Sequence, residues 1–329
     1  MKSFVIEQNS ANQRLDKFIT KNLPNLPQSL MYKYIRTKRV KVNNKRAEIS
    51  TRLNVGDVVD MYINDEFFEK ADPHYDFLHA SLDLDILYED ENLLVLNKKV
   101  GLLSHPDDTE YVDTLISRVK RYLYEKGEYD PDSEQVFTPA LINRIDRNTG
   151  GIVMAAKNAD TLRIMNQKVK NRELHKFYLC VTHGIPPKTE DLLVDYLIKD
   201  ESKNQVKVFD RQVPGSKEIK TYYRVLKTDK VLAERSGKRN VSLVEVELLT
   251  GRTHQIRAHM AFIGCPLVGD GKYGSNALNK ELGYKKQFLY SYKLQFDFTT
   301  DADILEYLNG KEFSVPIDDI WFAREFPDF

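Results

Sequence analysis

The chain has 329 residues, of which 41% are hydrophobic and 30% charged, and its 49 basic and 49 acidic residues give a formal net charge of zero. This composition is typical of a globular protein long enough for two domains, and it excludes a disordered chain. Two cysteines without a motif favour neither a disulfide framework nor a zinc site. The sequence has no apolar run near 18 residues and no N-terminal apolar segment, so we expect a cytoplasmic protein that does not enter membranes.

The charge is unevenly distributed along the chain. Residues 1–63 hold 12 Lys and Arg against 5 Asp and Glu, a net charge of +7, whereas the remainder has a net charge of −7. A basic segment joined to a near-neutral or acidic body favours a nucleic-acid partner, with a membrane surface as the other possibility. Seven uncompensated basic side chains on one short segment would repel each other, so we interpret them as an RNA surface and not as a solvated face. They are Lys33, Arg36, Lys38, Arg39, Lys41, Lys45 and Arg46.

The N-terminal segment predicts two short helices followed by a small sheet. Apolar spacing indicates a first helix that Asn12 caps and a second helix from about Ser29, and the last short strand is expected around Val59. The stretches RLDKFI, MYKYIRTKRVKVNNK and VGDVV resemble the small RNA-binding fold of ribosomal protein S-four. This resemblance implies an RNA-binding domain at 1–63, and the acidic and aromatic stretch 64–81 is predicted to be a linker.

The remaining chain, 82–329, predicts a domain in which strands outnumber helices. Its connections are too short and irregular for a regular alternating parallel sheet. We therefore expect an α+β fold with a large, mostly antiparallel sheet. The expected elements are a hairpin at 86–96, helices at 109–126 and 161–171, and strands at 152–156, 177–181 and 241–249.

Residues 140–158, ALINRIDRNTGGIVMAAKN, carry a single carboxylate between two arginines. Two glycines before an apolar run predict a tight turn into a buried strand, because glycine tolerates the backbone angles of such a turn. Asp146 is therefore expected on a loop at the start of a strand. From this stretch alone, an ordinary turn aspartate paired with arginine is the simpler interpretation.

Residues 249–274, LTGRTHQIRAHMAFIGCPLVGDGKYG, predict a helix that Thr253 caps and that ends near Gly264. Arg257 follows one turn after Thr253 and three residues after His254, so we expect these side chains to emerge together. The two histidines of the stretch are five residues apart and do not share a helix face, so they predict no metal site. The glycine-rich turn matches a dinucleotide-binding fingerprint in letters only, because it follows a helix instead of a strand.

Four stretches in this order resemble the RluA/RluD type of pseudouridine synthase, which isomerises uridine in RNA. They are YEDENLLVLNKKVGLLSHP at 88–106, LINRIDRNTGGIVMAAKN at 141–158, HKFYLCVTHG at 175–184 and GRTHQIRAHMAFIGCPLVGDGKYG at 251–274. The resemblance implies that Asp146 is the catalytic aspartate, Tyr178 the active-site tyrosine and Arg257 the arginine that pairs with the aspartate. Isomerising uridine involves no net redox change and no energy input, so we expect that no cofactor and no metal is needed.

The sequence departs from the family pattern at positions that carry no catalytic group. The usual His-Arg-Leu-Asp is Asn143-Arg144-Ile145-Asp146, the usual Thr-Ser-Gly is Thr149-Gly150-Gly151, and the usual Lys-Pro is Lys98-Lys99. These departures bear on target choice and loop geometry. They also prompt one alternative function, a catalytically inactive RNA-binding homologue.

The chemistry of the reaction suits these residue types. The glycosidic bond must break and one proton must later leave, so a carboxylate can act as a nucleophile or as a base at the sugar, and Arg257 favours its charged form. Tyr178 offers a ring to stack on the extruded base and a hydroxyl for the final proton, although a core aromatic is its simpler role outside this family. A second alternative, a carboxylate-dependent nucleic-acid hydrolase, needs a second acid that the motif around Asp146 does not supply.

We expect a monomer that binds RNA, with ribosomal RNA favoured over tRNA. The target base must leave its stack to reach a pocket, so basic side chains are expected to hold the flanking phosphates. The predicted RNA contacts are Lys33, Arg36, Lys38, Arg39 and Lys41 in the N-terminal domain, and Arg144, Arg147, Lys176, Arg252 and His254 in the body.

Overall fold

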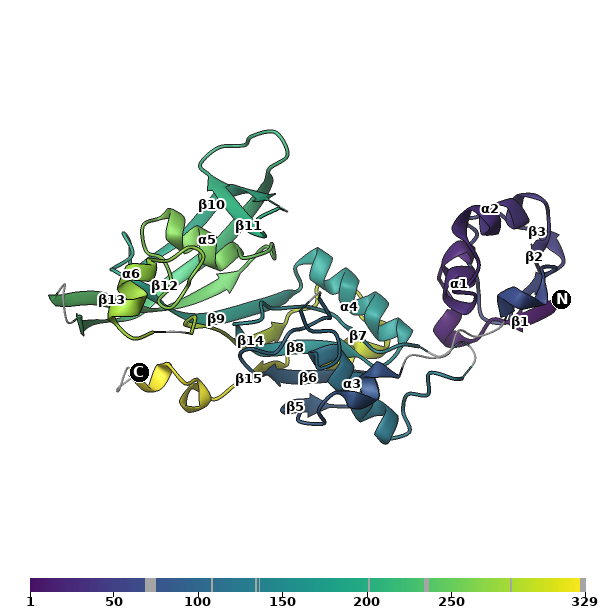
Figure 1. Ribbon diagram of the computed structural model, residues 1–329, viewed down its shortest axis with the longest axis horizontal. Coiled ribbons are helices and arrows are strands. Elements are labelled where there is room, and N and C mark those ends of the chain that lie inside the picture. The colour runs from purple at the N-terminus through teal and green to yellow at the C-terminus, as the bar shows by residue number, and fades with distance from the viewer. Residues whose placement is uncertain are drawn as a thin grey trace.

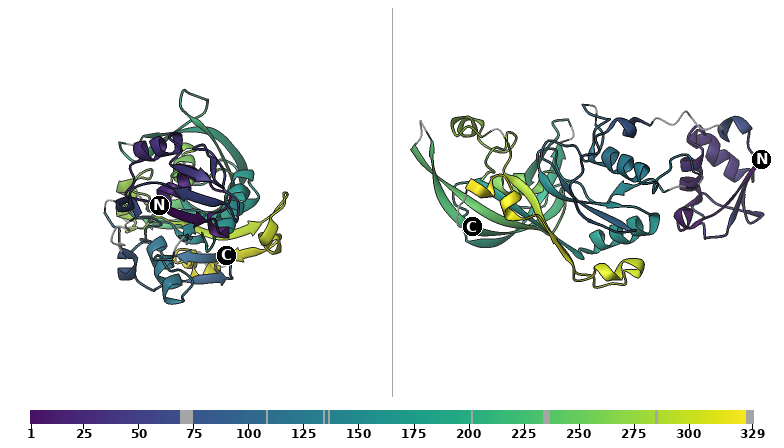
Figure 2. Two further views of the ribbon diagram at one scale, coloured as in Figure 1. Left: turned by 90° about the vertical axis from the view of Figure 1, so that its right-hand side faces the viewer. Right: turned by 90° about the horizontal axis from the view of Figure 1, so that it is seen from below.

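The computed structural model of the protein describes residues 1–68, 75–107, 109–133, 135, 137–200, 202–233, 237–284 and 286–325. At 231–233, 237–239 and 325 only the backbone is described. Figure 1 shows a small N-terminal domain set apart from a longer body that holds the rest of the chain. The views in Figure 2 agree: the N-terminal domain lies at one end of the molecule, and the long strands of the body curve away toward the other end.

The N-terminal domain combines two helices with a four-stranded antiparallel sheet. The sheet order is β1-β4-β2-β3. Apolar side chains from both helices and the sheet form one core, which includes Phe18, Ile35 and Val59. The elements are β1 (Lys2–Val5), α1 (Leu15–Asn22), α2 (Gln28–Arg36), β2 (Val40–Val42), β3 (Lys45–Arg46) and β4 (Val58–Met61).

Two local predictions in this domain have different outcomes. The sequence also predicts a turn at Asn43-Asn44. Both residues have positive φ, 50° and 60°, as a tight turn between β2 and β3 requires, so this prediction is confirmed. The prediction that Asn12 caps the first helix is wrong. Asn12 itself has a φ of 60°, and the N-cap position belongs to Arg14. The NH group of Asn12 donates to the carbonyl of Leu53, in the segment between β3 and β4.

The predicted linker 64–81 packs on two different cores. Phe67 and Phe68 contact the N-terminal core, whereas Phe77, in the 3-10 helix Asp76–His79, is buried in the body. Residues 69–74 of the predicted linker lie outside the described residues.

The body is built on one eleven-stranded sheet. Its order is β11-β10-β12-β13-β9-β14-β8-β6-β5, with β15 paired to β14 and β7 paired to β8. All of its described strand pairs are antiparallel except β14 with β8, so the expected α+β fold with a mostly antiparallel sheet is confirmed. The strands are β5 (Ile86–Glu89), β6 (Leu93–Lys98), β7 (Ala140–Leu141), β8 (Gly150–Ala156), β9 (Leu174–His183), β10 (Glu190–Asp200), β11 (Gln205–Phe209), β12 (Lys217–Ala233), β13 (Gly237–Leu248), β14 (Leu289–Phe296) and β15 (Glu312–Ser314).

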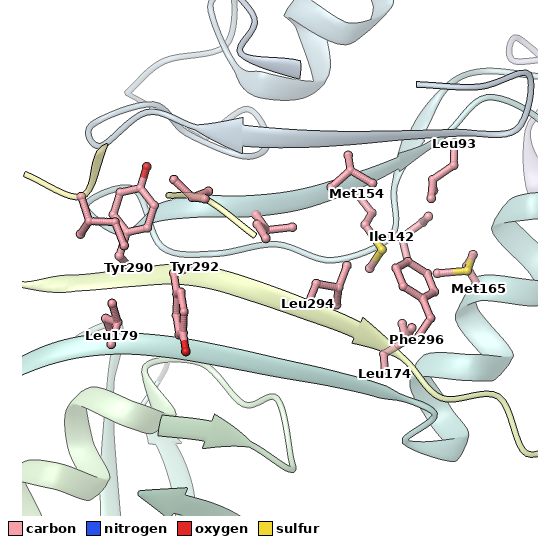
Figure 3. Packing of buried hydrophobic residues seen from close by; sticks show 14 of the residues in the cluster. Leu93, Ile142, Met154, Met165, Leu174, Leu179, Tyr290, Tyr292, Leu294 and Phe296 are labelled. Carbon is pink, nitrogen blue, oxygen red and sulfur yellow. The ribbon is translucent and has the colours of Figure 1, made fainter. Parts of the chain in front are cut away.

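Both faces of the central strands are buried under helices. Along β6, Leu93 and Val95 belong to one apolar cluster and Leu94 and Leu96 to another, as the period of two in a strand requires. The first cluster includes α4 (Ala159–Asn171), and the second includes α3 (Leu115–Glu125). Side chains of the first cluster meet beside α4 in Figure 3, among them Leu93, Met154, Met165 and Phe296.

The helix predicted at 109–126 begins later than expected. It starts at Leu115, because Thr114 takes the N-cap position and its side chain accepts a hydrogen bond from the NH of Ser117. The segment before it is bound in turns, in which the Asp107 carboxylate accepts hydrogen bonds from the NH groups of Thr109 and Glu110. Such turns compete with helix formation.

The start of β8 fixes the loop before it against β14. Gly151 has a φ of 109°, and a Cβ built there would lie 2.0 Å from the carbonyl oxygen of Ser291. Only glycine allows this conformation and this close approach. The parallel register Ser291↔Gly151 therefore holds residues 142–149 beside β14 and β9.

None of the described helices is long and apolar enough to span a membrane.

Candidate active site

Asp146 lies on the loop between β7 and β8, and the backbone around it is held on both sides. The hydroxyl of Ser104 donates to the carbonyl of Ile145 at 3.0 Å, and the NH of Gly101 donates to the carbonyl of Arg147 at 2.8 Å. The NH of Thr149 donates to the carbonyl of Asp146 itself at 3.1 Å. The carboxylate is therefore presented by a fixed loop, with 29% of its side chain exposed.

Arg257 pairs with two carboxylates at once. It lies on α5 (Gln255–Phe262), and its Nη1 donates to Oδ2 of Asp146 at 2.8 Å. Its Nε and Nη2 donate to the two oxygens of Asp270 at 2.7 and 2.9 Å, a bidentate pair that fixes the plane of the guanidinium. Burial opposes the charge on Arg257, but the two carboxylates outweigh it and raise its pKa above the ordinary value. The site therefore contains a permanent, oriented cation beside Asp146.

Asp270 is the residue that sequence reasoning missed. Its side chain is fully buried, and its Oδ1 also accepts hydrogen bonds from the NH groups of Lys272 and Tyr273. Burial alone would raise the pKa of Asp270, but Arg257 and these NH groups hold it below the usual value. Asp270 lies in the glycine-rich turn 269–274, which matches a dinucleotide-binding fingerprint in letters only. An aspartate followed by Gly-Lys-Tyr is a signal for a turn in which the carboxylate binds the backbone two and three residues later.

His254 precedes α5 and faces Asp146. Its backbone is in the left-handed region, with φ 53° and ψ 19°, and it occupies the N-cap position. The predicted cap at Thr253 is therefore wrong. The Nε2 atom of His254 lies 3.8 Å from Oδ2 of Asp146, and its Nδ1 lies 2.9 Å from the hydroxyl of Tyr273. Burial lowers the pKa of His254 to about 4, although the charge of Asp146 opposes this shift, so the imidazole is neutral at neutral pH.

Tyr178 lies on β9 and is 5% exposed, with its ring packed among Ile256, Met260 and Leu267. Ser291 on β14 is its cross-strand partner. Burial, assisted by the nearby charge of Asp146, raises the pKa of Tyr178 to about 12. The phenol is thus protonated at neutral pH, and it can accept the final proton only after its own proton has left.

Substituting Tyr178 with phenylalanine tests the part played by the hydroxyl. Tyr178→Phe keeps the buried ring and removes only the oxygen, so we expect normal RNA binding and a stable fold. If the hydroxyl takes part in the last proton transfer, the variant should break the glycosidic bond and then stall, with turnover lowered on the order of 10²- to 10⁴-fold. The measurement is single-turnover kinetics. Wild-type turnover in Tyr178→Phe would leave the residue with a packing role alone.

Lys98 is a second group beside the site that sequence reasoning did not single out. Its side chain is 1% exposed, and its Nζ donates to the carbonyl oxygens of Lys99, Leu102 and Arg147 at 3.1, 2.7 and 3.1 Å. Burial lowers the pKa of Lys98 to about 7, and the charge of Asp146 opposes the shift. Lys98 thus connects the end of β6 to the loop that carries Asp146.

The remaining predicted RNA contacts fall into two groups. Arg144 and Arg147 are exposed on the Asp146 loop, Arg252 is exposed two residues before His254, and Lys176 is half-buried on β9. Arg144 and Arg147 thus flank Asp146 on its loop, and Lys176 is two residues before Tyr178. The five in the other group lie in the N-terminal domain, where four are exposed and Lys41 is half-buried; they are Lys33, Arg36, Lys38, Arg39 and Lys41.

Among the described residues, no cluster of His, Cys, Asp and Glu could hold a metal ion.

Comparison with known proteins identifies the family. Residues 92–262 match the sequence profile of RNA pseudouridylate synthases, and residues 13–59 match that of the S4 domain. An uncharacterized RNA pseudouridine synthase of Mycoplasma capricolum is 32% identical over 313 residues, covering 94% of this chain and 96% of the relative. The ribosomal large subunit pseudouridine synthase C of Vibrio cholerae is 30% identical over 298 residues, covering 88% of this chain and 87% of the relative.

A solved structure shows the same fold. Human RNA pseudouridylate synthase domain containing 1 superposes with a TM-score of 0.54 at 23% identity, covering 72% of this chain and 85% of the human one. The catalytic fold, the family profile and the relatives over nearly the full length agree with each other. The chain therefore belongs to the RNA pseudouridylate synthase family, a family of isomerases, and carries an RNA-binding S4 domain at its N-terminus.

Proposed function

We propose that the protein converts uridine to pseudouridine in ribosomal RNA and that Asp146 is its catalytic group. The observation that carries this proposal is the asymmetry of the Asp146 carboxylate. Its Oδ2 accepts a hydrogen bond from Arg257, whereas its Oδ1 accepts none from any described residue. A carboxylate with one oxygen fixed and the other free can direct the free oxygen at a sugar atom.

The same geometry serves either chemistry at the sugar. Oδ1 of Asp146 would attack C1′ as a nucleophile or remove a proton from C2′ as a base. In both cases the carboxylate loses its negative charge during the reaction. Arg257 keeps a partner throughout, because Asp270 remains bound to its other two nitrogens. Arg257 is therefore not left as an unpaired buried cation when the carboxylate of Asp146 is neutral in the intermediate.

Asp270 also bears on the hydrolase alternative. It supplies a second carboxylate, but it is fully buried behind Arg257 and both of its oxygens accept hydrogen bonds. It is therefore not available as the second acid of a hydrolase. This arrangement favours isomerisation.

The target RNA is inferred from relatives. The relatives in Vibrio cholerae and Rickettsia felis are named ribosomal large subunit pseudouridine synthase C. We take ribosomal RNA as the substrate on this basis, and we propose that the protein acts in the cytoplasm as a monomer. Pseudouridines mapped in total RNA from cells with and without the protein test the proposal. The loss of a pseudouridine at a defined ribosomal site supports the proposal. The loss of a pseudouridine in tRNA would show that tRNA is the substrate. An unchanged map would indicate an inactive homologue.

We propose that residues 1–63 bind RNA, that 64–81 link the two parts and that 82–329 isomerise the uridine. The basic residues Lys33, Arg36, Lys38 and Arg39 are exposed on α2 and the turn after it. Together with Lys41, Lys45 and Arg46 they form no ion pair within the described residues. Their charge is therefore available to phosphates.

The salt dependence of RNA affinity measures these contacts. Each phosphate neutralised contributes roughly 0.7 to 0.9 to the slope of log affinity against log salt concentration. Substituting Lys33, Arg36, Lys38 and Arg39 with glutamine should flatten the slope by about 3, and deleting residues 1–63 should do at least as much if the body folds alone. Substituting Lys38 and Arg39 alone should give about half the change. Turnover at saturating RNA should persist. An unchanged slope would mean that these basic residues do not contact RNA and are only solvated surface charges.

A further inference from the structure

The backbone of His254 has a conformation that residues other than glycine rarely adopt, with φ 53° and ψ 19°. A non-glycine residue in the left-handed region costs free energy, and such residues persist where the surrounding structure determines them. This backbone positions an imidazole that is only 8% exposed between Tyr273 and Asp146. The hydrogen bonds to Asp146 and Arg257 described above do not include it, so its placement needs another explanation.

A chain of hydrogen bonds assigns the tautomer of His254. The NH of Val206, on β11, donates to the hydroxyl oxygen of Tyr273 at 2.8 Å. The single proton of that hydroxyl then has one acceptor among the described residues, which is Nδ1 of His254 at 2.9 Å. Nδ1 therefore accepts, and because the imidazole is neutral, the ring proton resides on Nε2. His254 thus presents an NH donor on the side that faces Asp146.

Among the residues that the structure describes, none offers an acceptor within hydrogen-bond distance of this donor. The nearest carboxylate oxygen, Oδ2 of Asp146, is 3.8 Å from Nε2, which is beyond hydrogen-bond distance, and Arg257 already donates to that oxygen. Nε2 is not among the fully buried side-chain atoms that lack a partner, so it is open to solvent in the free site. A substrate that closes over the site displaces that solvent and must offer an acceptor in its place, or the donor is left unpaired. A neutral imidazole suits a neutral oxygen better than a phosphate, which the surrounding arginines match in charge.

We propose that His254 donates from Nε2 to the 2′-oxygen of the target ribose and so selects ribose at the reacting nucleotide. The proposal rests on the proposed function, in which Asp146 acts on the sugar. The 2′-oxygen is bonded to C2′, which is either the carbon that Asp146 deprotonates or the neighbour of the carbon that it attacks. Both chemistries therefore place this oxygen beside the carboxylate. The 2′-hydroxyl is also the group by which a protein distinguishes RNA from DNA.

The test is a double-mutant cycle between the protein and the substrate. Synthetic RNAs carrying the mapped target position as uridine or as 2′-deoxyuridine are compared with the wild-type protein and with His254→Ala. We expect His254→Ala to lower kcat/KM about tenfold on the ribose substrate. On the deoxyribose substrate, which lacks the acceptor, the same substitution should change it less than about twofold. Equal losses on both substrates would overturn the proposal, because the effect of His254 would then be independent of the 2′-oxygen.

Two further variants separate a hydrogen bond from a structural role. His254→Gln keeps an NH donor near the Nε2 position and should restore most of the preference for ribose. Tyr273→Phe removes the group that fixes the tautomer, so it should weaken that preference while leaving His254 in place. Because 2′-deoxyuridine also affects the chemistry itself, the same cycle is read in Kd by fluorescence anisotropy, which needs no turnover.

The experiments distinguish a failure of the His254 proposal from a failure of the proposed function. If Asp146 does not act on the sugar, Asp146→Asn will retain turnover while the cycle at His254 still reports whether the 2′-oxygen is contacted. If Asp146→Asn is inactive and the cycle shows no coupling between His254 and the 2′-oxygen, the proposed function is supported and the role of His254 is contradicted. Thermal unfolding of each variant, expected within a few degrees of wild type, shows that the fold is intact.

Discussion

The variant Asp146→Asn is expected to lose isomerisation while it still binds RNA. The amide keeps the shape of the side chain and can accept a hydrogen bond from Arg257, but it is neither a nucleophile nor a base at the sugar. We expect turnover to fall on the order of 10⁴-fold or more. Isomerisation releases the hydrogen at C5 of uracil, so release of tritium from RNA labelled at that carbon measures the rate.

A matched variant controls for the change of carboxylate to amide. Asp160→Asn makes the same substitution in the first turn of α4, where Asp160 contacts Gln8 of the N-terminal domain and Arg163. It should release tritium at the wild-type rate. Tritium release by Asp146→Asn above background, with RNA bound at the wild-type Kd, would show that another group carries the chemistry.

The second large effect is expected at Arg257, in both stability and activity. Arg257→Met leaves Asp270 buried without its cation, and removing one partner of a buried ion pair costs about 3 to 5 kcal/mol of unfolding free energy. It also removes the hydrogen bond that orients Oδ2 of Asp146. We therefore expect a lower denaturation midpoint and almost complete loss of turnover.

A double variant separates the two roles of this arginine. Combining Arg257→Met with Asp270→Asn replaces the stranded carboxylate with a neutral amide, so much of the lost stability should return. Turnover should stay low, because Asp146 still lacks its cation. Urea denaturation and single-turnover rates for the single and double variants make the comparison. Recovery of turnover in the double variant would mean that Arg257 serves only to neutralise Asp270.

Much of this site could be anticipated from local sequence, and the rest depends on contacts between distant segments. The glycine pair before an apolar run located the Asp146 loop, because a tight turn into a buried strand has a local signature. The bidentate partner of Arg257 had none, since Asp270 reaches it only after the chain has turned beyond α5. Lys98 has no local signal for the same reason, because its acceptors include the carbonyl of Arg147, 49 residues away in sequence.

The errors in element boundaries have a common cause. Asn12 and Thr253 have the side chains of helix caps, yet Arg14 and His254 occupy those positions. In both cases a residue near the expected cap has a positive φ, which starts the helix later. Hydrogen bonds to other parts of the chain determine that conformation, and a propensity for capping contains no information about them.

The place of β14 in the sheet determines when this protein can become active during its synthesis. β14 (Leu289–Phe296) pairs with β9 on one side and with β8 on the other, so it joins two groups of strands that are made long before it. Asp146 precedes β8, whereas Tyr178 lies on β9, and in the described sheet β14 lies between these two strands. A nascent chain folds from its N-terminus, so we expect the S4 domain to be complete while Asp146 and Tyr178 are still apart. We therefore expect the growing chain to bind RNA before it can modify it.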